Sequence, residues 1–125
     1  MLQSVDNDLL QAVLDSWDRN NRILVNLLRA VPPGCYQARV VPTSPSVIEM
    51  FGHMIYVRLI FVSEDAPEWA VTLDPRDWLR ETDPERLAAG LDSSARTVRK
   101  AVEDRLGPVS RCNSTTTILC CFCNT

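Results

Sequence analysis

The chain has 125 residues, of which 46% are hydrophobic and 23% charged, and its formal net charge is −3. This length predicts a single domain, and the composition excludes a disordered or fibrous chain. A protein that binds nucleic acid by neutralising phosphates normally carries a basic excess, which is absent, so we expect no nucleic-acid partner. Four glycines and one histidine exclude a glycine-rich phosphate loop and a metal site made of several histidines from one chain.

No part of the sequence approaches the ~20 consecutive apolar residues of a membrane-spanning helix. The N-terminal segment MLQSVDNDLL carries two aspartates and lacks the basic region that opens a signal peptide. We therefore expect a cytoplasmic protein with no membrane partner.

The first predicted helix runs from about residue 6 to residue 30. Its apolar residues recur at spacings of three and four, which is typical of an amphipathic helix. Ser4 or Asp6 is expected to cap its start, and Pro32 and Pro33 followed by Gly34 end it.

Two further helices are predicted, at about residues 44–63 and 83–106. Pro45 suits a first helical position, and Ser46 and Glu49 have capping-box spacing. The second of the three helices is apolar nearly all round, so it is expected to be buried on several sides or to meet a partner chain. Thr82 and Glu85 have the same capping-box spacing ahead of the third helix.

The connecting segments are expected to be irregular. Residues 35–43 read as a long loop, and residues 64–82 as an irregular stretch with a short helical turn after Asp74. Trp69 and Trp78 are expected to anchor this stretch to the helices, and Trp17 is expected to pack in the same way.

His53 lies midway along the second helix, and Glu49 precedes it by one turn on the same face. The two could act as a base and its orienting group, or as a metal ligand with a supporting carboxylate. The simpler interpretation is a capping glutamate and a buried or half-buried histidine satisfied by a neighbour, and it is favoured for both residues.

The cysteines form no recognisable site. Four of the five lie in the last fourteen residues, in the pattern C-x7-C-C-x-C. Structural zinc sites use cysteine pairs two to four residues apart, so adjacent Cys120 and Cys121 fit one poorly. Cys35 has no histidine near it in sequence to activate a thiolate, and we interpret it as a small buried apolar residue.

The segments SWDRNNRILVNLLRAVPPG and PSVIEMFGHMIYVRLIFVSEDAPE resemble the DinB (DinB/YfiT-like) family. The resemblance covers about residues 9–106, and its best motif is S-V-x-E-x-F-x-H-M on the second helix. It implies an all-α, up-down bundle of four helices, of which three are present over residues 1–108. The fourth is missing or replaced by an aberrant Cys/Thr-rich tail at residues 109–125.

The resemblance also implies a metal-dependent transferase or hydrolase of unknown substrate. Three histidines bind a divalent metal in that family, one from the middle of helix two and two from an H-x-x-x-H pair on helix four. His53 matches the first position, and the chain has no other histidine. The expected cofactor of the intact family is therefore zinc, nickel or a similar divalent metal. We expect this chain not to bind it and to be inactive.

The tail suggests a slip of the reading frame between about Leu106 and Cys112. Back-translated and read from the third base of each codon, STTTILCCFCNT permits DYDHPLLLLQH, which looks like the start of an amphipathic helix. A genuine divergent tail is the alternative.

Three helices without a fourth would expose an apolar groove, which usually means a partner or aggregation. The tail segment Ile118–Cys123 could fold over that groove, or two chains could pair through it as a homodimer. The sequence thus leaves three hypotheses: a truncated DinB-like enzyme, a non-enzymatic helical interaction or dimerisation module, and a redox or zinc module built on the tail cysteines.

Overall fold

The structure is a computed structural model that describes residues 2–107, with side chains from residue 7 onward. The predicted Cys/Thr-rich tail, its four cysteines, the proposed frame slip and the fold-back of residues 118–123 lie outside the described residues.

Three long α-helices make up most of the described chain: α1 (Leu2–Ala30), α2 (Val47–Asp65) and α3 (Pro84–Leu106). Three short 3-10 helices connect them, η1 (Pro33–Cys35), η2 (Pro67–Trp69) and η3 (Pro75–Arg80). Within residues 2–107 the only β-type pairing is an isolated bridge between Arg39 and Ser46. The predicted all-α class and its three long helices are confirmed, while a bundle of the DinB type stays a prediction.

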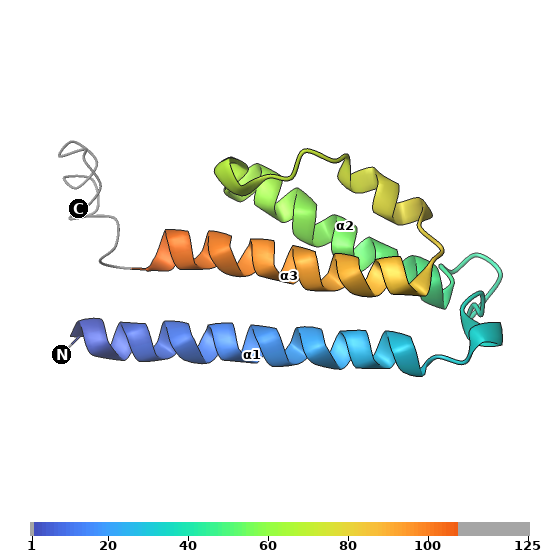
Figure 1. Cartoon of the computed structure of the whole chain (residues 1–125), viewed down its shortest axis with the longest axis horizontal. Coiled ribbons are helices and arrows are strands. Elements are labelled where there is room, and N and C mark those ends of the chain that lie inside the picture. Colours follow the sequence, from blue (N-terminus) through green and yellow to red (C-terminus); the bar gives the residue numbers. More distant parts are fainter. Residues whose placement is uncertain (1, 108–125) are drawn as a thin grey trace.

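The simple up-down alternation predicted for the bundle is wrong, because α2 and α3 run in the same direction (Figure 1). The contacts fix these directions. Trp17 of α1 reaches Ala95, near the middle of α3, and Arg29 at the end of α1 meets Glu85 at the start of α3. By contrast, Arg58 in α2 meets Leu91 in the first half of α3, and Glu68 of η2, just after α2, meets Arg105 near the end of α3. The chain returns from the end of α2 to the start of α3 through η2 and η3.

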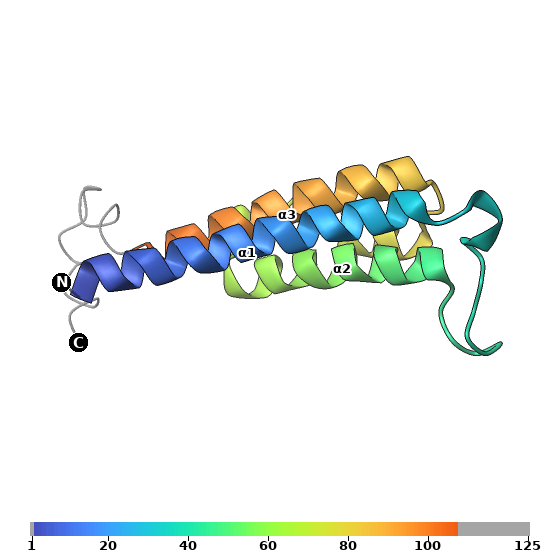
Figure 2. The ribbon, with the colours of Figure 1, turned by 90° about the horizontal axis from the view of Figure 1, so that it is seen from below.

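Helix α3 is the central element, because it packs against both α1 and α2, whereas α1 and α2 have few contacts with each other. Figure 2 shows α1 and α2 lying along α3. The larger core cluster takes apolar side chains from all three helices: Val25, Leu28, Ile48, Phe51, Ile55, Leu59, Leu87, Ala88 and Leu91. A smaller cluster near the other end contains Val62, Ala66, Val98 and Ala101. Burial against α3 therefore holds the two outer helices in place.

The helix starts partly match the sequence predictions. Ser46 caps α2, and its capping box with Glu49 is confirmed, although Pro45 lies outside the helix. At α3 the cap is Asp83, which accepts a hydrogen bond from the Glu85 backbone, so the prediction of Thr82 is wrong. Helix α1 begins at Leu2, ahead of Ser4 and Asp6, which were predicted to cap it.

The segment between α2 and α3 is held by one tryptophan. Trp78 of η3 packs against the larger core cluster, which confirms its anchoring role, whereas Trp69 is 37% exposed. The turn predicted after Asp74 is η3, and the Asp74 side chain caps it. Gly52 of α2 and Gly90 of α3 make room for Trp78: a Cβ on Gly52 would collide with the Trp78 carbonyl, and one on Gly90 with its ring.

We predict that Gly52→Ala destabilises the fold by about 1–3 kcal/mol, since backbone of η3 must move to admit the methyl group. The measurement is the urea midpoint followed by circular dichroism. Gly34→Ala is the matched control, because no heavy atom lies within 4 Å of the Cβ it would add. Equal midpoints for the two variants would contradict the close packing of η3 on α2.

Candidate functional site

An apolar groove of about 660 Å³ lies where α1 and α2 diverge over α3. Its walls come from α1 and α2 and its floor from α3, with twelve lining residues: Val13, Leu14, Trp17, Leu24, His53, Met54, Val57, Arg58, Phe61, Val98, Arg99 and Val102. Several large apolar side chains on its walls are exposed, including Val13, Val57 and Phe61 at 46–49%. The arrangement is that of a helical bundle with one helix position open.

Arg58 joins the three helices beside this groove. Its Nη1 donates to Asn21 Oδ1 on α1 at 2.9 Å, and to Leu91 O at 2.9 Å and Ser94 Oγ at 3.2 Å on α3. Burial lowers the pKa of the Arg58 guanidinium from its ordinary value, and the charge of Asp92 opposes that change. Asn21 Nδ2 in turn donates to Asp92 Oδ1 at 2.8 Å. The half-buried cation is thus bonded through Nη1 to partners on α1 and α3, which offsets part of the cost of its burial.

Trp17 and Arg99 complete this end of the groove. The Trp17 ring lies 4.8 Å from the Arg58 guanidinium carbon, within cation–π range, and its Nε1 donates to Ala95 O at 3.0 Å. The predicted packing role of Trp17 is confirmed. Arg99 is paired with Asp18 Oδ2 at 2.6 Å and with Glu103 at 3.0 Å. These contacts fix the register of α1 on α3.

His53 lies on the α2 wall of the groove and also faces a neighbouring hollow lined by Glu49 and Leu79. Its side chain is exposed, so the interpretation as a buried or half-buried histidine is wrong. The reason is that His53 lies between two open hollows, and no described element covers the imidazole. Its ring lies 6.0 Å from the Tyr56 ring, in a tilted arrangement.

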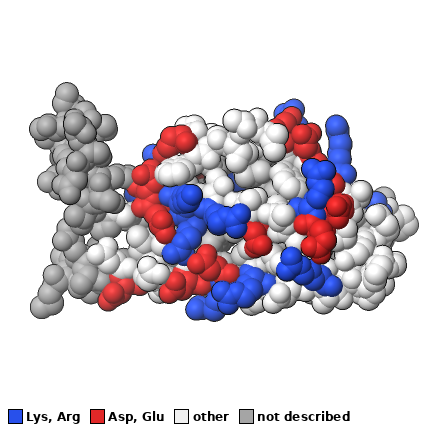
Figure 3. Space-filling view, in the orientation of Figure 1, with Lys and Arg blue, Asp and Glu red and all other residues white. Residues whose placement is uncertain are grey.

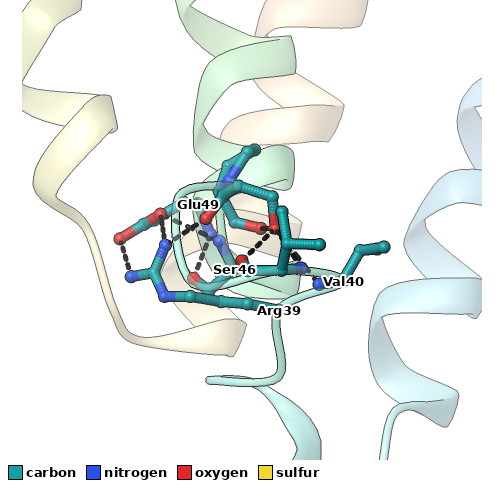
Figure 4. A network of polar contacts seen from close by, with 7 residues as sticks. Arg39, Val40, Ser46 and Glu49 are labelled. Atoms are coloured by element: carbon teal, nitrogen blue, oxygen red, sulfur yellow. Dashed lines mark hydrogen bonds and ion pairs between the residues drawn. The ribbon is translucent and has the colours of Figure 1, made fainter.

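The Glu49 carboxylate is bonded to Arg39 and to the Ser46 backbone. Its two carboxylate oxygens accept from both terminal nitrogens of Arg39 at 2.9 and 3.0 Å, and Oε2 also accepts from the Ser46 backbone N–H (Figure 4). The capping interpretation of Glu49 is therefore confirmed. Hydrogen bonds from Arg39, then from the Ser46 backbone, lower the pKa of Glu49 below its ordinary 4.5. No bond joins Glu49 to His53 among these contacts.

Cys35 is exposed at the end of η1, so its interpretation as a small buried residue is wrong. The backbone places it in a loop beyond the end of α1, away from the core clusters.

The metal site that the family resemblance implies does not fit the described residues. A catalytic zinc site usually takes three protein ligands. Within residues 2–107 no three side chains of histidine, cysteine, aspartate or glutamate come together in a way that could hold an ion. His53 is the single imidazole in the chain, and Glu49 is bound to Arg39.

The charged side chains do not form one large patch on the face seen in Figure 3, where basic and acidic groups alternate in small clusters. Of the helices in the described part of the chain, none is long and apolar enough to cross a membrane. Comparison with known proteins gives no relative: no family model, no curated protein and no solved structure matches the chain.

The residues at the centre of the site were only partly predicted. Sequence reasoning singled out His53 and Glu49 and passed over Arg58 and Asn21. A signal was present, because Arg58 is the one cation in the apolar run MFGHMIYVRLIFV. A cation within an apolar helix needs hydrogen-bond partners from neighbouring helices. Its presence in the run therefore indicates a place where helices meet.

We predict that Glu49→Gln lowers the melting temperature at neutral pH and that this difference disappears in acid. A carboxyl group whose pKa is depressed on folding stabilises the protein above its unfolded pKa, here about 4.5, and loses that effect as the pH falls through the folded pKa. Melting temperatures of both proteins between pH 7 and pH 3 test this. Glu64→Gln on the same helix is the control, since the Glu64 side chain makes no hydrogen bond or ion pair among the described residues.

Proposed function

We propose that the chain is a non-enzymatic helical interaction module that forms a homodimer through the groove between α1 and α2. The observation that carries this proposal is the groove itself. Helices α1 and α2 pack on α3 and leave exposed apolar side chains along both walls of a groove of about 660 Å³. Exposed apolar surfaces of this kind mark interaction sites in soluble proteins.

The shape of the groove favours a helix as its occupant. Met50, Met54, Val57 and Phe61 recur on α2 at spacings of four and three, so they form a ridge parallel to the helix axis. Val13, Trp17 and Leu24 border the same groove from α1. A helix that enters between two such ridges makes the packing found in coiled coils and helical bundles.

A second copy of this chain supplies a matching helix. Helix α1 has 29 residues, so it is about 43 Å long, and it exposes apolar residues over most of that length. Its described acidic residues (Asp8, Asp15 and Asp18) precede its arginines (Arg19, Arg22 and Arg29), so two copies carry complementary charge. Closed pairs of identical chains are the commonest oligomers of soluble proteins.

We predict that the purified full chain sediments as a dimer, with twice the 14.1 kDa mass of one chain, and that Val57→Glu makes it monomeric. Val57 is 49% exposed on the groove wall, so a glutamate there is tolerated in the monomer but is buried without a partner in the dimer. Analytical ultracentrifugation measures the mass, and we expect the dissociation constant to rise by roughly tenfold or more.

Leu73→Glu is the matched control, because Leu73 is 68% exposed in the connection between η2 and η3 and does not line the groove. It should remain dimeric. A wild-type chain that is monomeric at all concentrations, or equal dissociation constants for the two variants, would overturn the proposal.

A second candidate is the DinB-like metal-dependent enzyme, in a form inactive for want of ligands. The observation that favours it is the position of His53 on the groove wall, where a further helix covering the groove would face it. That helix would have to bring the remaining ligands, because the described residues offer none. The reaction would be of the transferase or hydrolase class implied by the resemblance, and its substrate is unknown.

We predict that Ni²⁺ titrated into the wild-type chain and into His53→Ala gives the same heat by calorimetry, because one imidazole does not hold a metal tightly. Heat common to both proteins would come from other groups, the tail cysteines among them. Micromolar binding that His53→Ala abolishes would show a site that includes His53 and would contradict the ligand-deficient interpretation.

A further inference from the structure

Helix α1 exposes a row of residues at alternating spacings of four and three, which is the pattern of a coiled-coil seam. We call it the heptad row; it consists of Leu9, Val13, Ser16, Asn20, Ile23 and Leu27. Its four apolar members are 49–64% exposed, although all are large aliphatic side chains. Neither core cluster includes any of them. The row lies next to the α1 wall of the groove, where Val13 belongs to both.

The heptad row is symmetric about residue 18. Leu9 and Leu27 stand nine residues to either side, Val13 and Ile23 five, and Ser16 and Asn20 two. In an antiparallel pair centred on that residue, each apolar side chain therefore meets an apolar one, and the polar pair meets at the middle. A slip of one heptad would place Leu9 opposite Asn20, so the polar centre selects the register.

The charges of α1 select the antiparallel direction. A second row at seven-residue spacing contains Asp8, Asp15, Arg22 and Arg29, two acids followed by two bases. An antiparallel copy brings its acids level with the bases of the first copy, whereas a parallel copy would place like charges side by side. These groups lie on another face of α1, so they form no direct ion pairs between the copies, and their long-range attraction, which salt screens, favours the antiparallel direction.

The groove accommodates this arrangement. Trp17 of α1 contacts Arg58 of α2, so the centre of the heptad row lies level with the middle of α2. An antiparallel α1 from a second copy, centred there, meets the edge of the groove at Val13, the member of the heptad row that lines it together with Val57 and Phe61. Because the interface is isologous, both copies make the same contacts.

From these observations we propose that two copies pair through α1 in an antiparallel register centred on Asp18, with Val13 of one copy facing Ile23 of the other. The proposal rests on the proposed dimerisation through the groove and specifies its partner helix, direction and register.

The test is a charge-pair rescue in the full chain, read by analytical ultracentrifugation. Val13→Glu alone and Ile23→Lys alone each bury an unpaired charge opposite an aliphatic residue. We expect each to raise the dissociation constant roughly tenfold or more. The double variant Val13→Glu/Ile23→Lys places glutamate opposite lysine twice in the antiparallel dimer, and we expect it to associate at least about tenfold more tightly than either single variant.

The outcomes separate this proposal from the one it rests on. If Val57→Glu breaks the dimer while the two α1 single variants leave it unchanged, the groove is the interface and α1 is not its occupant. If both single variants weaken the dimer and the double variant weakens it further, the pairing is parallel or in another register, and the proposal is overturned. A monomeric wild-type chain overturns both proposals. Circular dichroism of each variant shows whether it is folded, and Val13 and Ile23 are exposed enough for the monomer to tolerate both changes.

Discussion

In the described part of the chain, the Arg58 guanidinium and the Asn21 amide bonded to it join all three long helices through polar contacts. The Arg58 side chain extends from α2, and its guanidinium carbon lies 4.8 Å from the centre of the Trp17 ring of α1. It donates hydrogen bonds to Asn21 on α1 and to the Leu91 carbonyl and Ser94 on α3. Partial burial of a cation is costly unless partners compensate it, so these contacts favour one placement of the three helices relative to one another. The level of α1 and α2 along α3 follows from that requirement.

The groove is a consequence of the same arrangement. Arg58 links α2 to α1 at one level, yet the helices bury their apolar faces mainly against α3. Beyond the larger core cluster, α1 and α2 separate, and the side chains between them have no described helix to cover them. The exposed Val57 and Phe61 of α2 and the exposed Val13 of the heptad row line the same unfilled packing position. A dimer would fill it with α1 from a second copy.

The chemistry open to His53 depends on the groups that surround it. Its position on α2 places it on the groove wall, as a residue that faces a further helix should be. Glu49, one turn earlier, is held by Arg39 and the Ser46 backbone, and so is not free to orient the imidazole. Glu49 is the carboxylate one helical turn before His53, and its capping function leaves it bonded elsewhere.

The sequence alone determined the three long helices, the capping box of α2 and the anchoring of Trp17 and Trp78, because helical periodicity and cap spacing are local properties of the chain. It also contained the heptad row of α1, which is symmetric whatever the fold. Only the tertiary structure decided that α2 and α3 run parallel, that His53 and Cys35 are exposed, and that Arg58 rather than Glu49 belongs to the site. Each of these depends on which residues distant in sequence meet, and the return segment after α2 and the burial on α3 set those meetings.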